Sequence, residues 1–198
     1  MKNKINIIGL CLILFVAMPV LFKQNTFAAK ASKIDSKFTE PVTFSKKEYS
    51  LIKTKELKEL TVYLFFQPKE DALKWSSYIT KNQWKKNRRI FSDIVMPYYQ
   101  SSKSSWLIKA WMEEVEDSKF NEEYLMRFIN VGPDGKSAMY SLHRIVKNKR
   151  VVRSVIYSVY IPYDAKKDSD KTFLARIKKN ATNHEDKWIE EIKQFELF

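Results

Sequence analysis

One turn limits the fold of this 198-residue chain more than any other feature. Residues 132–135 read Gly-Pro-Asp-Gly, and glycine beside proline favours the backbone angles of a tight turn. Stretches rich in β-branched and aromatic residues flank this run at 124–131 and 137–146. A connection this short joins antiparallel neighbours. The sequence therefore predicts two antiparallel strands paired across this turn.

Further strands are predicted from the character of other segments. Residues 60–67 are an unbroken run of β-branched and aromatic side chains closed by proline, which is typical of a buried strand. Residues 105–115 and 151–161 place their apolar side chains on one face of a strand. A short strand is also expected at 42–44. Short connections then favour an antiparallel meander.

Helices are predicted where apolar side chains recur every three or four residues. This spacing predicts a helix over 70–99, which Pro97 ends or kinks. Two helices are expected after residue 170, and the second opens with a capping box made by Thr182 and Glu185. Because strands and helices are segregated along the chain, the predicted fold class is α+β. We expect an antiparallel sheet, a meander of about four to five strands, with helices packed on it.

The amino terminus has the three parts of a secretory signal: a positive start, an apolar run over 5–22 and small residues after it. Thr26 and Ala28 stand three and one positions before a predicted cut that precedes Ala29. The sequence therefore predicts export to the periplasm or the extracellular medium. The alternative is a membrane anchor made by an uncleaved amino-terminal segment, because an apolar run of about 18 residues is near the lower limit for spanning a bilayer.

The resulting domain organisation has three parts. We predict a signal peptide over 1–28, a flexible lead-in over 29–47 and a single α+β domain over 48–198. The last segment is long enough to bury a hydrophobic core of its own.

Composition excludes several kinds of functional site. The only cysteine, Cys11, lies in the predicted signal, so the mature chain has no disulfide, thiol nucleophile or thiolate metal site. Two histidines are too few for a histidine-rich metal site. After the signal, the only glycines are those of the 132–135 turn, whereas phosphate-binding loops need several. The sequence predicts no cofactor and no metal.

A hydrolase-like enzyme using His143 or paired carboxylates is the alternative function. His143 shares a strand face with Ser141, so the pair has residue types that nucleophilic catalysis uses. The GxSxG elbow is absent, and two residues on one strand face lack a separately supported base. We therefore favour a structural role for His143. The candidate carboxylates are Glu113, Glu114, Glu116, Glu122 and Glu123, which are expected at solvated strand ends.

The chain has a net charge of +13, and its clusters of basic residues are the feature that says most about a possible function. The candidate anion-binding residues are Lys85, Lys86, Arg88 and Arg89 in a first cluster and Lys147, Lys149 and Arg150 in a second. The first cluster is expected on the opening turns of the predicted helix, with its cations facing outward. Such clusters attract polyanions, although lysine-rich faces also simply keep a protein soluble. A third group, Lys166, Lys167, Lys178 and Lys179, is diluted by acids.

The function predicted from these features is a non-enzymatic exported binding or accessory protein. Its expected partner is an anionic envelope surface or another exported protein. The chain has no pattern of a known nucleic-acid-binding module, so specific nucleic-acid binding is not expected. The oligomeric state is left open by the sequence.

Residues 60–80, LTVYLFFQPKEDALKWSSYIT, resemble the opening of some small exported bacterial proteins of unknown function. Trp75, Ile79 and Thr80 fit the W-x-x-x-I-T stretch of those proteins, and the Gly-Pro-Asp-Gly turn before a strand fits as well. These proteins are similar to the broad Mog1/PsbP class of α/β/α sandwiches. The resemblance implies a fold and a compartment but no activity. It also implies a strand over 76–84 and a helix that starts nearer Lys85.

Overall fold

The computed structural model describes residues 36–68, 76–102, 107–132 and 135–198. The predicted signal peptide lies outside the described residues, as do the two central residues of the turn at 132–135.

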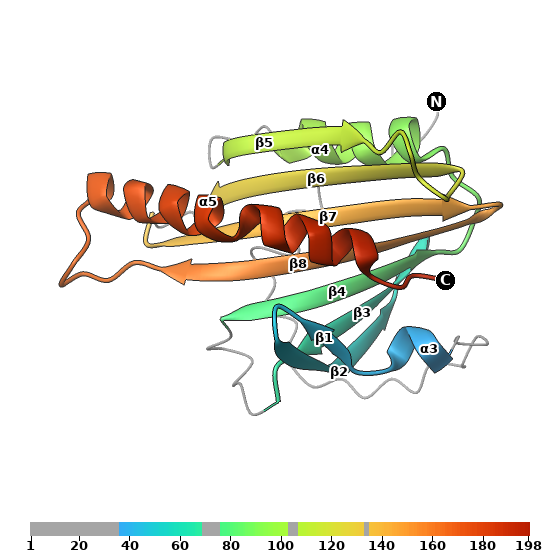
Figure 1. Ribbon diagram of the computed structural model, residues 1–198, viewed down its shortest axis with the longest axis horizontal. Helices are drawn as coiled ribbons and strands as arrows, with labels where there is room; N and C mark the ends of the chain where they lie inside the picture. Colours follow the sequence, from blue (N-terminus) through green and yellow to red (C-terminus); the bar gives the residue numbers. More distant parts are fainter. Residues whose placement is uncertain (1–35, 69–75, 103–106, 133–134) are drawn as a thin grey trace.

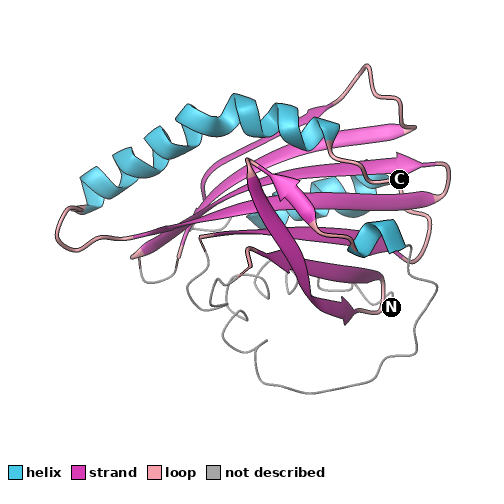
Figure 2. Cartoon of the chain, turned by 60° about the horizontal axis from the view of Figure 1, so that its bottom comes forward, coloured by secondary structure: helices cyan, strands magenta, loops and turns pink. Residues whose placement is uncertain are grey.

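Eight antiparallel strands form one curled sheet, a half-barrel whose curvature is visible in Figures 1 and 2. The order across the sheet is β1-β2-β3-β4-β8-β7-β6-β5. The sheet therefore consists of two meanders, β1 to β4 and β5 to β8, which join where β4 pairs with β8. The strands are β1 (Val42–Phe44), β2 (Lys47–Glu56), β3 (Leu60–Phe66), β4 (Ser77–Trp84), β5 (Leu107–Glu114), β6 (Glu122–Val131), β7 (Ser137–Asn148) and β8 (Val151–Pro162).

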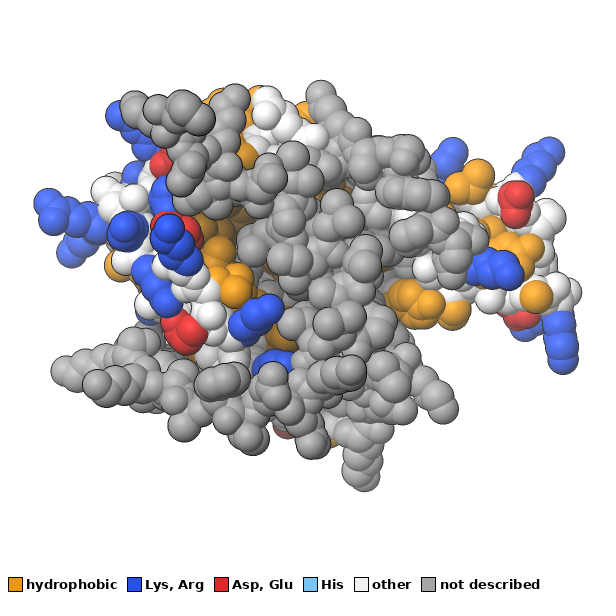
Figure 3. All heavy atoms as spheres, turned by 180° about the vertical axis from the view of Figure 1, so that it is seen from behind, with side chains coloured by type: hydrophobic (Ala, Val, Ile, Leu, Met, Phe, Trp, Pro, Cys, Tyr) orange, Lys and Arg blue, Asp and Glu red, His pale blue; other side chains and the backbone are white. Residues whose placement is uncertain are grey.

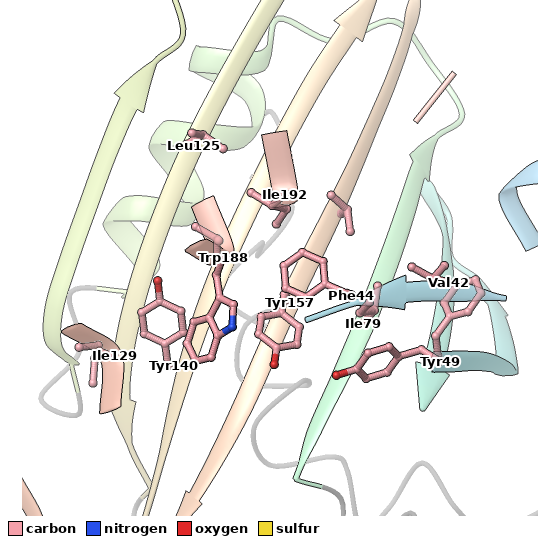
Figure 4. Packing of buried hydrophobic residues seen from close by; sticks show 14 of the residues in the cluster. Val42, Phe44, Tyr49, Ile79, Leu125, Ile129, Tyr140, Tyr157, Trp188 and Ile192 are labelled. Carbon is pink, nitrogen blue, oxygen red and sulfur yellow. The ribbon is translucent and has the colours of Figure 1, made fainter. Parts of the chain in front are cut away.

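One long helix, α5 (Asp170–Gln194), crosses one face of the sheet over β7 and β8 (Figure 1). It begins at a capping box, in which Ser169 Oγ accepts from the Thr172 N–H and Thr172 Oγ1 accepts from the Ser169 N–H. Its buried side chains follow helical spacing and enter the main core: Phe173, Ile177, Ala181, Trp188 and Ile192. Trp188 packs between the rings of Tyr140 and Tyr157, each with a centroid 5.3 Å away (Figure 4).

The opposite face of the same strands is covered by a π-helical turn, η1 (Ile90–Val95), and by α4 (Met96–Ser102). Ile90, Ile94 and Val95 bury their side chains there against β6, β7 and β8. With α5 on one face and η1 on the other, β7 is buried at nearly every position of its central part, and β8 is buried to a similar extent. A short helix, α3 (Ser36–Thr39), precedes β1 and buries Phe38.

The predicted fold class is wrong. The protein is mostly an antiparallel sheet of eight strands curled into a half-barrel, instead of an α+β domain built on a meander of about four to five strands with packed helices. The sequence interpretation assigned no strand to β2, in which lysines alternate with other residues. Residues 36–47 of the predicted flexible lead-in are folded, since Phe38, Val42 and Phe44 belong to the core.

The predicted helix over 70–99 is also wrong in its first half. Residues 77–84 form β4, the strand expected from the resemblance described above, and 69–75 lie outside the described residues. This strand lies between β3 and β8, and its polar residues Thr80, Lys81 and Asn82 are buried. For example, Asn82 Nδ2 donates to Ser154 Oγ at 3.0 Å.

Other elements agree with the sequence. The strand at 42–44 and the strand over 60–67 are confirmed, and the two strands flanking the Gly-Pro-Asp-Gly turn pair antiparallel as predicted, from Val131↔Ala138 onward. The two predicted helices after residue 170 are a single helix. Thr182, the expected cap, lies inside it and donates to the Lys178 carbonyl.

Candidate functional site

The structure brings the two predicted basic clusters to the same end of the sheet. In the β4–β8 pair, Gln83 lies opposite Arg153, so the residues that follow β4 lie beside the start of β8. The second cluster occupies the turn from β7 into β8, where Asn148 pairs with Val151. We call this region the basic end, made of Lys85, Lys86, Arg88, Arg89, Lys147, Lys149 and Arg150. Lysine and arginine side chains gather at this end in Figure 3, at the left of the view.

The first cluster does not lie on a helix, contrary to the prediction. Residues 85–89 connect β4 to η1, and Arg89 has an extended backbone just before the π-helical turn. Asp93 Oδ2 accepts from the Arg89 N–H at 3.1 Å and so caps this start. Of the apolar residues expected to hold the helix to the core, Ile94 and Val95 are buried but Phe91 is exposed.

Three of the seven candidate cations make ion pairs with acids. Lys85 contacts Glu56 at 2.6 Å, Arg88 contacts Glu59, and Lys147 contacts Glu122 at 2.6 Å. The hydrogen bond from Lys85 is the main cause that lowers the pKa of the Glu56 carboxyl. Each pair links two neighbouring segments of the chain. In each pair the acid neutralises the charge of the cation locally.

The other four candidate cations, Lys86, Arg89, Lys149 and Arg150, are exposed, and within the described residues their side chains pair with no acid. Lys149 has a φ of 55°, the left-handed conformation that closes the two-residue turn. Two exposed apolar side chains accompany them, Phe91 at 44% and Val151 at 39% of full exposure.

His143 is a core residue on β7. Its ring lies edge-on to Tyr98 and Phe128, with centroids 5.0 and 5.1 Å away. Burial alone lowers its pKa to about 3, so the imidazole is neutral at physiological pH. Ser141, on the same face of β7, shares a hydrogen bond of 3.2 Å with Ser158 on β8. The two residues proposed for the enzyme alternative are thus engaged in packing and sheet contacts.

Two of the candidate carboxylates are likewise engaged with cations. Glu123 is buried and accepts from Arg144 Nε at 2.7 Å, while Glu122 accepts from Lys147 and from the Ile90 N–H. These contacts hold β6, β7 and η1 together.

A pocket of about 610 Å³ was not expected from the sequence. It lies between the α3–β1 segment and the tail that follows α5, and Lys81 and Arg153 line it from the sheet. Its other lining residues are Phe38, Glu40, Pro41, Val42, Thr43, Phe44, Ser45, Lys46, Glu191, Gln194, Phe195, Glu196, Leu197 and Phe198.

Lys81 and Arg153 are buried cations on adjacent strands, 3% and 9% exposed. Lys81 Nζ donates to the Phe38 carbonyl at 3.1 Å and lies 4.7 Å from the centre of the Phe65 ring. Arg153 Nη1 donates to the Leu197 carbonyl at 2.7 Å. Both cations lie over the ring of Phe38, at 5.3 and 4.8 Å from its centroid.

The acids of the pocket lie farther out. Glu40 and Glu196 are exposed, and Glu191 is engaged by the Ser45 N–H at 2.6 Å and by Lys187 at 3.6 Å. The two buried cations on the sheet side thus face a rim that carries these three glutamates together with exposed Lys46. The sequence offers one signal for this pair, a lysine and an arginine inside strand segments, where charged side chains are rarely fully buried unless they are paired.

The chain matches no known family model, and no curated protein is detectably similar to it. Across the described ranges, no helix is both long and apolar enough to cross a membrane. The same residues contain no group of three acidic, histidine or cysteine side chains placed to hold a metal ion.

Proposed function

We propose that this protein is an exported, non-enzymatic binding protein that attaches to an anionic envelope surface through its basic end. The observation that carries the proposal is the set of four exposed cations without acidic partners in the described chain, beside two exposed apolar side chains. The expectation of export rests on the amino-terminal signal in the sequence.

The physical basis is the sum of small electrostatic and apolar contributions. Each lysine or arginine close to an anionic lipid surface contributes about 1 kcal/mol, so Lys86, Arg89, Lys149 and Arg150 together would contribute about 4 kcal/mol. Phe91 and Val151 can add apolar contact at the interfacial region without crossing the bilayer. Exposed Glu116 and Asp117 belong to the connection from β5 to β6, which lies at the same end of the sheet because Asn121 bonds to Lys147 and Lys149, so these acids offset part of the attraction.

The test is co-sedimentation of the exported protein with phosphatidylglycerol vesicles at low and high salt, beside neutral phosphatidylcholine vesicles. Binding should be confined to the anionic vesicles and weaken steeply with salt, because the screening length falls to about 8 Å at physiological ionic strength. A variant with Lys86, Arg89, Lys149 and Arg150 changed to glutamine should lose most of this binding.

The matched control removes the same number of charges elsewhere. Lys166, Lys167, Lys178 and Lys179 are exposed residues of α5 and the segment before it, and changing them to glutamine should leave binding largely unchanged. Equal losses in both variants would show that only net charge matters. Undiminished binding by the first variant would reject the basic end as the attachment site.

A further inference from the structure

We propose that the edge strand β5 pairs with β5 of a second copy of this chain, so that the sheet continues across a two-fold axis centred on Trp111. β5 is the last strand in the order of the sheet, and in the described part of the chain it pairs with β6 alone (Figure 1). The strand at the other edge, β1, has only three residues, whereas β5 has eight. A long edge strand is a ready template for another strand. This inference goes beyond attachment through the basic end and does not depend on it.

The pairing of β5 with β6 shows which backbone groups face the outer edge. The Val115 N–H donates to the Glu123 carbonyl at 3.0 Å, and this pair continues the regular register of the two strands from residue 109 onward. In an antiparallel ladder, hydrogen-bonded positions alternate along each strand. The odd-numbered residues of β5 therefore turn their N–H and C=O groups toward β6. The even-numbered residues Ala110 and Met112 turn theirs outward, where a further strand can bond to them.

The charges of β5 select one register for a second copy. Lys109 and Glu113 stand two residues before and after Trp111, on the same face of the strand. When two copies pair antiparallel with Trp111 opposite Trp111, each Lys109 lies opposite Glu113 of the second copy. Side chains at such non-hydrogen-bonded positions lie close together, and opposite charges there stabilise the pairing. A shift by two residues places Lys109 opposite Trp111 or Val115 instead, and the charge pairs are lost.

The other side chains of β5 agree with this register. It places Ala110 opposite Met112 of the second copy, and both are half-buried beside the apolar cluster that includes η1. On the other face, the Trp111 ring lies over Arg127, whose Cζ is 3.9 Å from the ring centroid, and Arg127 pairs with Glu185 of α5 at 2.5 Å. The central side chain is thus held in place before two copies meet, which reduces the entropy lost on association.

Natural sheet edges are commonly protected from pairing by a lysine or a β-bulge, and β5 has both. The bulge lies between Leu107 and Lys109, so residues 109–114 keep a regular register and can pair on their outer side. Lys109 disfavours a strand that presents a cation or an apolar side chain opposite it. It favours a strand that presents Glu113 there, so the edge discriminates in favour of its own copy.

The experiment measures self-association of the exported protein by sedimentation equilibrium, at low salt and without vesicles. Over about a hundredfold range of protein concentration, the unchanged protein should pass from monomer to dimer by mass action. Lys109→Glu and Glu113→Lys each replace two opposite-charge pairs by two like-charge pairs, so each should weaken the dimer by about tenfold or more. Lys171→Glu and Glu190→Lys make the same charge changes at exposed positions of α5 and should leave the dimer unchanged.

Recombining the two charge reversals tests the register itself. In an equimolar mixture of the Lys109→Glu and Glu113→Lys proteins, each heterodimer again has opposite charges at both positions. The mixture should therefore associate about as strongly as the unchanged protein, and so should the double variant Lys109→Glu/Glu113→Lys. Ala110→Pro removes an N–H that faces the outer edge and none that β6 uses, so it should abolish association while circular dichroism shows the fold retained.

Three results would overturn the proposal. These are a protein that stays monomeric at every concentration, a dimer that neither charge reversal weakens, and a mixture that associates no better than its two components. None of the substituted residues belongs to the basic end, and antiparallel pairing points the two basic ends of the dimer in opposite directions. Self-association and vesicle binding are therefore separate measurements, and the failure of one is distinguishable from the failure of the other.

Discussion

Arg144 provides the sharpest test of how the carboxy-terminal part of the protein is held to the sheet. Its Nε donates to Glu123 at 2.7 Å, and both side chains of this ion pair are only 4% exposed. Its Nη1 donates to the carbonyls of Ile192 at 3.1 Å and Phe195 at 2.8 Å, at the end of α5 where helical carbonyls lack intrahelical partners. One side chain therefore joins β6, β7 and the tail.

Replacing Arg144 by methionine removes the cation but keeps much of the side-chain volume. Glu123 then remains buried, with the Ser118 hydroxyl as its remaining hydrogen-bond partner among the contacts described here. Breaking a buried ion pair by removing one partner costs about 3–5 kcal/mol, mostly because a charge is left uncompensated. We expect Arg144→Met to lower the free energy of unfolding by about that amount.

The assay is urea denaturation followed by far-ultraviolet circular dichroism at pH 7, with the double variant Glu123→Gln/Arg144→Met measured in parallel. The double variant should recover part of the loss, because it leaves no buried charge behind, and Glu123→Gln alone should be costly. A loss below about 1 kcal/mol in Arg144→Met, or strictly additive losses in the double variant, would refute the reasoning.

Three further outcomes are expected. His143 has a pKa of about 3 in the folded protein against 6.5 for a free imidazole, so its contribution to stability is complete above pH 6.5 and is lost progressively as the pH falls toward 3. Urea midpoints at pH 7 and pH 4.5 should therefore differ less in His143→Phe than in the unchanged protein, and an equal difference would contradict this. Ser169→Ala removes the cap of α5 and should cost about 1 kcal/mol in the same assay, whereas Thr182→Ala, within the helix, should cost less. Amino-terminal sequencing of the exported protein should give a start at or near Ala29, and a product that keeps Met1 and pellets with membranes would argue for the anchor instead.

The sequence predicted well those elements in which the local strand or helix propensity agrees with the burial that the element has in the fold. The strands β6 and β7 flank an unambiguous turn, and β3 is an unbroken β-branched and aromatic run, so local propensity and burial agree. For β4 they disagree. Its Thr80, Lys81 and Asn82 are polar in the sequence but buried in the fold, and Lys81, for example, lies against the rings of Phe38 in α3 and Phe195 in the tail after α5.

The candidate sites likewise divide into features that the local sequence shows and features that depend on distant contacts. Composition located the cations of the basic end, but only the pairing of β4 with β8 places the two clusters together, and only the loops show which cations an acid neutralises. The pocket depends on residues separated by more than a hundred positions, such as Phe38 and Leu197. No local pattern in a single sequence reports contacts of that range.

The pairing of β4 with β8 also has a consequence for the order of folding. It is the one strand pairing between the two meanders in the described sheet, and it joins Ser77 to Val159 across a long stretch of chain. Contacts of such high sequence separation form slowly, because the loop they close must lose its entropy first. Each meander can assemble from local hairpins, whereas Lys81 and Arg153 become neighbours only when the two meanders meet. The pocket that both side chains line would therefore take its final shape only in that last step of folding.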